Sequence, residues 1–150
     1  MSRLDEVGER DGWRCWLCDL AVDPDMSVND ARGPSIDSVT SKAKAKGPTP
    51  AVGNERLAHR ACNTKKGAIA PVVPWPDEIF VVDPAPILAA VERLARRRGR
   101  DVMARCPTEA DAVAAGDWLV DRISRLVPAL DVTATAEPGG GQYLLVISTR

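Results

Sequence analysis

Apolar positions are sparse in the first seventy residues and form only short runs. Residues 36–40 are a short run rich in β-branched residues that favours a strand, and residues 56–58 are a candidate for a second one. Residues 3–12 have the pattern of a short amphipathic helix or turn, and residues 60–66 can form a second helix that ends at Gly67. This part of the chain therefore predicts small elements that build little core of their own.

The pattern changes after residue 86, where apolar residues recur at helical spacing and then alternate. Asp83 and Pro84 suit the cap and first turn of a helix. The expected elements are a helix from about 84 to 96, a strand at 102–106, a helix at 109–127 capped by Thr108, and strands at 132–136 and 143–148 around the turn 138–141. The order predicts a small α-β-α-β-β unit.

The long helix should bury one face against the strands that follow it. We expect that face to consist of Ala110, Val113, Ala114, Trp118, Ile123 and Leu126. The largest of these, Trp118, should be largely buried against the hairpin of residues 132–148.

Five prolines separate these two parts, although the segment between them is too apolar for a free linker. The sequence predicts an α+β protein with one domain at 1–68, a proline-rich ordered strap at 69–86, with 79–82 as a strand, and a second α+β domain at 87–150.

Composition limits the broad class of the protein. Of its 150 residues 45% are hydrophobic, which is ordinary for a globular chain and argues against wholesale disorder. No apolar run approaches the roughly 20 residues that a membrane-spanning helix needs, and the N-terminus has no signal-peptide core. We therefore expect a cytoplasmic protein with no membrane partner, in which clustered cysteines bind metal and do not form disulfides.

Two pairs of soft ligands stand in the first domain. Cys15 and Cys18 form a C-x-x-C pair, and His59 and Cys62 form an H-x-x-C pair about forty residues later. Each pair allows two ligand atoms to point at one centre, and two such pairs are typical of a tetrahedral zinc site. The spacing predicts one structural Zn²⁺ held by these four residues.

The stretch that contains the second pair also carries a family signature. Residues 54–67 read NERLAHRACNTKKG, which resembles the end of the HNH endonuclease family in its zinc-finger branch, "N-x-x-L-A-H-R-x-C-N-x-x-K-G". Residues 36–39, IDSV, stand where that family usually carries "V-D-H-V". The resemblance covers roughly residues 10 to 68 and implies a zinc-stapled ββα-metal module.

The resemblance also implies roles for four residues. Asp37 and Asn63 would bind a catalytic Mg²⁺ or Mn²⁺, and Asn54 would hold the loop that carries the general base. Ser38 stands at the position of that base, where the family usually has a histidine, so the sequence leaves open whether the protein cleaves phosphodiesters.

Counting histidines makes this substitution important. His59 is the only histidine of the chain, so a zinc-bound His59 leaves no histidine to act as the base. If His59 were instead catalytic, Cys106 would have to supply the fourth zinc ligand. A serine hydroxyl is not a base at neutral pH without an activating partner, and the missing base would cost roughly 10²–10⁴-fold in rate.

Charge is distributed unevenly, although the whole chain has a net charge of −1. Residues 32–67 hold eight lysines and arginines against two acids, whereas residues 1–31 hold three arginines against eight acids. A local basic segment is what a phosphate-facing surface needs, and the alternative is a solvated loop. The candidate nucleic-acid-binding residues are Lys42, Lys44, Lys46, Arg56, Arg60, Lys65 and Lys66.

Three functions follow from these observations. The first is a weakly active or inactive HNH-like zinc protein that binds DNA or RNA. The second is an active HNH-type nuclease that uses a base other than histidine. The third is a protein-interaction module whose second domain forms the interface.

Overall fold

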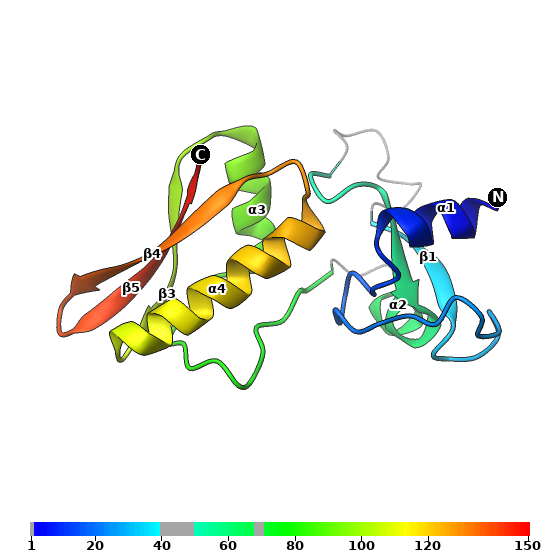
Figure 1. Ribbon diagram of the computed structural model, residues 1–150, viewed down its shortest axis with the longest axis horizontal. Helices are drawn as coiled ribbons and strands as arrows, with labels where there is room; N and C mark the ends of the chain where they lie inside the picture. The colour runs from blue at the N-terminus through cyan, green and yellow to red at the C-terminus, as the bar shows by residue number, and fades with distance from the viewer. Residues whose placement is uncertain (1, 40–49, 68–70) are drawn as a thin grey trace. The chain divides into compact units, whose positions relative to one another are not determined.

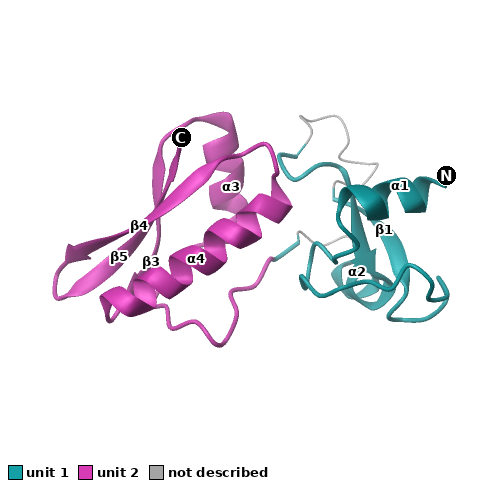
Figure 2. Cartoon of the chain, viewed as in Figure 1, with its two compact units in different colours: residues 1–72 teal, residues 73–150 magenta. Residues whose placement is uncertain are grey.

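The computed structural model describes residues 2–39, 50–67 and 71–150, and in these residues the chain is a mixed α/β protein. The described part contains four helices and two small antiparallel sheets, and it divides into two compact units, Met1–Val72 and Val73–Arg150 (Figures 1 and 2). None of its helices has both the length and the apolar character needed to cross a membrane. The residues expected to form a strap at 69–86 are, from residue 73 onward, part of the second unit.

The first unit contains the strand, strand and helix expected from the sequence, preceded by a short helix. Its elements are α1 (Arg3–Arg10), β1 (Pro34–Ser38), β2 (Glu55–His59) and α2 (Arg60–Lys66). Ser2 and Asp5 form a capping box that begins α1. Strands β1 and β2 pair antiparallel with Asp37 opposite Arg56, and both α1 and α2 contact them.

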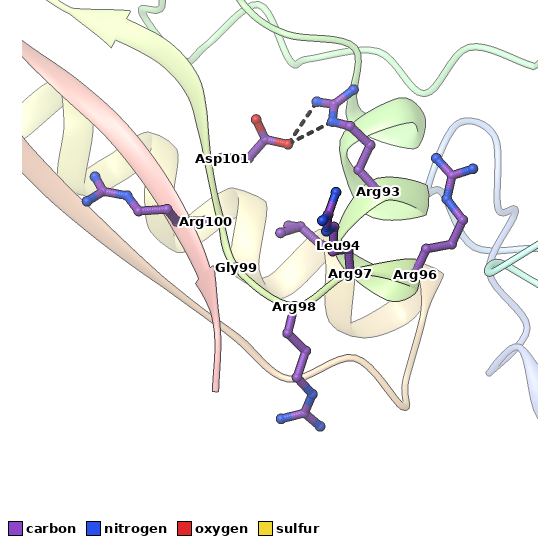
Figure 3. A pocket seen from close by; sticks show the side chains of 8 residues that line it. All are labelled: Arg93, Leu94, Arg96, Arg97, Arg98, Gly99, Arg100 and Asp101. Carbon is purple, nitrogen blue, oxygen red and sulfur yellow. Dashed lines mark hydrogen bonds and ion pairs between the residues drawn. The ribbon is translucent and has the colours of Figure 1, made fainter.

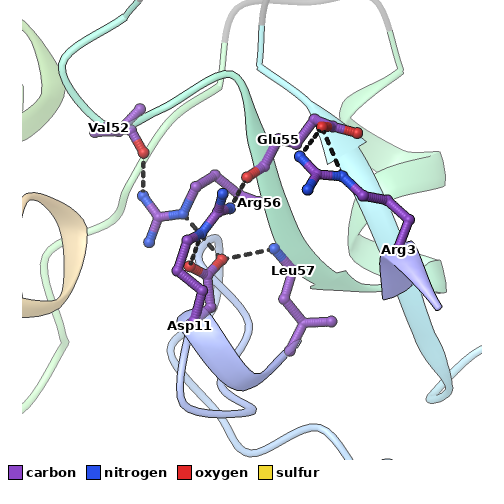
Figure 4. A network of polar contacts seen from close by, with 7 residues as sticks. Arg3, Asp11, Val52, Glu55, Arg56 and Leu57 are labelled. Carbon is purple, nitrogen blue, oxygen red and sulfur yellow. Dashed lines mark hydrogen bonds and ion pairs between the residues drawn. The ribbon is translucent and has the colours of Figure 1, made fainter. Parts of the chain in front are cut away.

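A network of polar contacts, partly buried, fastens α1 to β2 (Figure 4). Asp11, which caps α1, accepts hydrogen bonds from Arg56 Nε at 2.9 Å and from the backbone N–H of Leu57 at 2.8 Å. Arg3 pairs with the Glu55 carboxylate. Because the Asp11 and Arg56 side chains are each only 6% exposed, this ion pair is an internal part of the first unit.

The second unit is a three-stranded sheet with helices packed on it. Its elements are α3 (Ile87–Arg96), β3 (Arg100–Cys106), α4 (Glu109–Leu126), β4 (Val132–Gly139) and β5 (Gln142–Thr149). The α-β-α-β-β order is as expected, and β5 lies between β3 and β4 and is antiparallel to both (Figure 1). A backbone irregularity between Val102 and Ala104 shifts the β3 register, and the intervening Met103 is fully buried.

The buried face of α4 is rotated relative to the expected one. Thr108 caps the helix as predicted, but the buried positions are Ala112, Ala115, Gly116, Leu119, Arg122, Ile123 and Leu126. Val113 is 50% exposed, so the prediction was wrong for Val113, and it was also wrong for Ala110 and Ala114, which are exposed. Gly116 explains the rotation, because a Cβ there would lie 2.9 Å from Ala134 Cβ, and its absence lets α4 approach the sheet closely.

Trp118 is half-buried, and its aromatic contact comes from the segment that precedes α3. Its ring centroid lies 5.5 Å from that of Trp75, whose indole N–H donates to Ala85 O at 2.9 Å. Trp118 is thus partly buried, and its packing against the hairpin of residues 132–148 stays a prediction. Residue 75 lies in the proline-rich segment, so part of that segment is integral to the second unit.

The expected beginning of the first helix in this unit and the expected strand at 79–82 also differ from the structure. Helix α3 begins at Ile87, with Pro86 as its cap, and not near residue 84. The reason is that a residue followed by a proline, here Ala85, disfavours helical backbone angles. Of residues 79–82, only Val82 forms a bridge, with Arg105.

Candidate metal centre and its surroundings

The four predicted zinc ligands come together in the first unit. One ligand atom each from Cys15, Cys18, His59 and Cys62 lies within 4.8 Å of all the others. Cys18 Sγ and Cys62 Sγ are 3.3 and 3.9 Å from His59 Nδ1. Zinc bonds of about 2.3 Å to sulfur and 2.0 Å to nitrogen place tetrahedral ligands roughly 3.5 Å apart, so the cluster is close enough to bind a metal ion such as zinc.

Local backbone structure positions the two cysteines of the first pair. Cys15 N–H donates to Leu20 O at 2.9 Å, and the return bond from Asp19 N to Cys15 O is 2.8 Å. Asp19 has a φ of 67°, which closes the turn in the left-handed region. The resulting knuckle is joined to β2 by a bond from Trp16 N to Leu57 O, so Cys15 and Cys18 face the end of the strand that carries His59.

The second pair is positioned by the junction between β2 and α2. His59 is the last residue of β2 and the cap of α2, and Cys62 lies in the first turn of that helix. The His59 Nε2 atom lies 2.9 Å from Ala21 O, which favours a proton on Nε2 and leaves the Nδ1 lone pair to face the three sulfur atoms. The His59 backbone N–H also donates to Cys15 Sγ at 3.4 Å, and such a bond stabilises a thiolate.

The electrostatics of the cluster are those of a site that a cation must neutralise. Burial and, after it, the negative charges of the Cys15 and Cys18 thiolates together raise the pKa of the Cys62 thiol to about 12. Burial also raises the pKa of Cys18. Three closely spaced sulfur atoms cannot all ionise without a positive partner, and a divalent metal supplies that partner.

Cys106, the alternative fourth ligand, takes no part in this cluster. It is fully buried on β3 in the second unit. His59 occupies the ligand position, so the alternative in which His59 acts as a base and Cys106 replaces it is not the arrangement that forms.

Asp37, the expected ligand of a catalytic cation, is buried and already has two donors. Its side chain is 3% exposed. Oδ2 accepts a hydrogen bond from Trp16 Nε1 at 3.0 Å, and Oδ1 lies 2.9 Å from the ammonium nitrogen of Lys66. A cationic side chain of the protein itself therefore stands at the carboxylate that the resemblance assigns to Mg²⁺ or Mn²⁺.

The other three residues of the expected catalytic set lie around the same strands. Asn63 donates from Nδ2 to Ser35 Oγ at 2.8 Å and to Ile36 O at 3.2 Å, so its amide nitrogen fastens α2 to β1. Ser38 is exposed at the end of β1, opposite Glu55 in the strand pairing. Asn54 is exposed just before β2, and its backbone carbonyl oxygen accepts a hydrogen bond from the backbone N–H of Val39 at 2.7 Å.

The structure divides the expected nucleic-acid-binding residues into three groups. Arg56 and Lys66 were assigned wrongly, because their side chains are only 6% and 8% exposed and are paired with Asp11 and Asp37. Arg60 and Lys65 are exposed on α2. Lys42, Lys44 and Lys46 lie outside the described residues.

Sequence reasoning missed the structural role of Trp16. Its side chain is 1% exposed and connects the cysteine knuckle to Asp37, while the Arg56 guanidinium carbon lies 5.8 Å from the centre of its ring. Its bond to Asp37 depends on strand pairing and has no signal in the sequence.

Comparisons with known proteins do not extend this description. No protein family, no curated protein and no solved structure matches the chain.

Proposed function

We propose that the first unit is a zinc-stabilised, HNH-like module that binds nucleic acid and does not cleave it efficiently. The observation that carries this proposal is the state of Asp37, which is buried between Trp16 and Lys66. A catalytic cation would have to displace the Lys66 ammonium from this carboxylate before it could reach a phosphate.

The absence of a suitable general base also supports the proposal that the protein does not cleave nucleic acid efficiently. The only histidine lies in the cysteine cluster, where its Nδ1 faces sulfur. The exposed Ser38 has no histidine to activate it. Efficient hydrolysis needs both a metal that stabilises the charge on the phosphate and a base that takes a proton from water, and this site supplies neither in an accessible form.

The zinc in this proposal acts as a structural staple. The first unit is small, and the fully buried side chains of its core are few, chiefly Val7, Trp16 and Leu57. A metal that joins the knuckle at residues 15–18 to the β2–α2 junction would supply stability that so small a core lacks.

Helix α2 is the element that presents the binding surface. Arg60 and Lys65 border a shallow hollow of about 380 Å³ on its exposed side. Arg60 Nη1 donates to Val28 O at 3.2 Å, which orients its guanidinium group without neutralising it. Phosphate contacts of this kind give sequence-independent, salt-sensitive binding.

The experiment uses the zinc-loaded full chain and labelled duplex DNA and RNA, with affinity measured by fluorescence anisotropy at several salt concentrations. Arg60→Gln with Lys65→Gln should weaken binding and reduce the slope of log K against log salt by about two units for duplex DNA. Arg3→Gln with Arg14→Gln removes the same charge from the same unit and should leave the slope nearly unchanged. Equal losses from both pairs would contradict α2 as the binding surface.

A further inference from the structure

The second unit carries a strongly basic hollow between the end of α3 and the start of β3. It has a volume of about 690 Å³ and is lined by Leu94, Gly99, Asp101 and five arginines, Arg93, Arg96, Arg97, Arg98 and Arg100 (Figure 3). All five arginines are exposed, and Glu92 and Asp101 are the only acids between residues 92 and 101.

The internal partners of these arginines leave most of the charge available. Arg93 is held by Asp101, with 2.8 Å between Nη2 and Oδ2, and Arg100 is held by Glu137. Arg98 donates to Arg150 O at 2.6 Å, which orients its guanidinium without neutralising it. Arg96 and Arg97 make no side-chain hydrogen bond or ion pair within the described part of the chain.

Compensation of the helix dipole does not account for a cluster of this size. The C-terminal end of a helix carries the equivalent of roughly half a negative charge, which Arg93 and Arg96 in the last turn of α3 already match. Arg97 is the cap, and Arg98 and Arg100 lie beyond the helix, so their charges need another explanation.

The directions of the side chains distinguish between a small anion and an extended one. Figure 3 shows the labelled arginines spreading around the turn between α3 and β3, with Arg98 and Arg100 pointing away from Arg96. A pocket for one phosphate would have donors that converge on a single point. Guanidinium groups spread over a surface suit a chain of phosphates, each of which can accept two parallel N–H bonds.

We propose that this arginine hollow, defined as Arg93, Arg96, Arg97, Arg98 and Arg100, is a second nucleic-acid surface that binds backbone phosphates without reading sequence. It lies wholly in the second unit, so its binding does not depend on zinc or on the surface of α2. The protein would thereby hold nucleic acid through both of its units.

The test measures anisotropy of labelled DNA and RNA with the zinc-loaded full chain across a salt series. Arg96→Gln with Arg97→Gln should weaken binding and lower the salt slope by about two units on duplex DNA. Because neither side chain has an internal ion-pair partner, the melting temperature should change little, by no more than the loss of the Arg96 charge from the last turn of α3 accounts for. Arg96→Lys with Arg97→Lys should retain the slope, since it retains the charge.

The matched control is Arg105→Gln with Arg125→Gln, which removes two charges from the same unit outside the hollow and should leave the salt slope close to that of the unchanged protein. Affinity and slope unchanged by Arg96→Gln with Arg97→Gln would overturn this proposal and leave α2 as the only surface. A loss of binding in this variant, but not in Arg60→Gln with Lys65→Gln, would support the hollow and overturn the α2 surface instead. Competition by free nucleoside triphosphate, at the phosphate concentration of the DNA, would overturn the backbone assignment in favour of a small anion.

Discussion

Lys66 lies against Asp37 in the interior of the first unit, with 2.9 Å between Nζ and Oδ1 and with only 8% and 3% of the two side chains exposed. Helix α2 thus contributes a cation to the carboxylate of β1. The pair fastens the helix to the strand and occupies the aspartate that the resemblance assigns to a catalytic cation.

The first prediction concerns the stability of this pair. Lys66→Met leaves the Asp37 charge buried and opposed only by the Trp16 indole, and it should lower the free energy of unfolding by about 3 kcal/mol. Urea unfolding, followed by the NMR amide signals of residues 34–38 and 55–59, measures it. Lys65→Met, one residue away and exposed, should change stability by less than about 0.5 kcal/mol.

Adding Asp37→Asn to Lys66→Met should recover part of the loss, because no charge then remains buried. If Lys66→Met is as stable as the unchanged protein, the two side chains do not form a buried pair.

The second prediction concerns zinc. Purified protein should contain one zinc ion per chain. Cys62→Ser or His59→Ala should abolish zinc binding. Cys106→Ser should leave it intact, because Cys106 lies outside the cluster. Chelation should unfold the first unit and leave the amide signals of β3, β4 and β5 in place. Zinc retained by the Cys62 variant, measured by elemental analysis, would disprove the assignment of ligands.

The affinity for zinc should also depend on pH. Burial raises the pKa of the Cys62 thiol to about 12, so at neutral pH the metal-free site holds a proton that zinc must displace. Raising the pH lowers the cost of that displacement, so the apparent affinity should increase with pH. Competition with a chromophoric chelator at several pH values measures this, and an affinity independent of pH would argue against thiolate ligands.

The third prediction distinguishes two causes of weak cleavage: the absence of a general base at Ser38 and the occupation of the Asp37 carboxylate by Lys66. From the sequence alone, Ser38→His would be expected to restore Mg²⁺- or Mn²⁺-dependent nicking. The Lys66–Asp37 pair changes this expectation, because the cation site is filled. Ser38→His together with Lys66→Ala should nick DNA faster than either single variant, with a gain that can approach the roughly 10²–10⁴-fold contributed by a general base.

Asp37→Ala added to that double variant is the control, and it should remove the gained activity. Equal nicking by Ser38→His with and without Lys66→Ala would mean that Lys66 does not obstruct the metal.

The fourth prediction concerns the two tryptophans of the second unit. Trp75 and Trp118 lie at a ring-centroid distance of 5.5 Å and are tilted by 35°. Alanine variants of each and of both should reveal a coupling energy of about 0.5–1.5 kcal/mol in a double-mutant cycle. Strictly additive losses in urea unfolding would show that the proline-rich segment contributes no specific contact through Trp75.

The metal cluster was predictable from the sequence because the two residues within each ligand pair are close in the chain. C-x-x-C and H-x-x-C impose local geometry, and any fold that joins the pairs creates the site. The end of α2 was equally local, since Gly67 marks it. The elements of the second unit followed from periodicity, as their observed order confirms.

The exposure of the basic residues was not predictable in the same way. Arg56 and Lys66 were expected at the surface because arginine and lysine side chains are seldom buried. Their burial depends on Asp11, 45 residues from Arg56, and on Asp37, 29 residues from Lys66. Ion pairs between residues so far apart in the chain cannot be recognised from the periodicity of apolar positions. The face of α4 was misjudged for a related reason, because Gly116 allows a close contact that ranking residues by hydrophobicity does not anticipate.

The most direct test of the account is a gel assay of the zinc-loaded full chain with supercoiled DNA in Mg²⁺ or Mn²⁺, beside the Asp37→Ala variant. The gel reports binding as retardation and cleavage as nicked circles. The account predicts retardation that weakens with added salt and no more nicked product than the variant gives. Metal-dependent nicking by the unchanged protein that Asp37→Ala abolishes would contradict it, as would the absence of retardation at low salt.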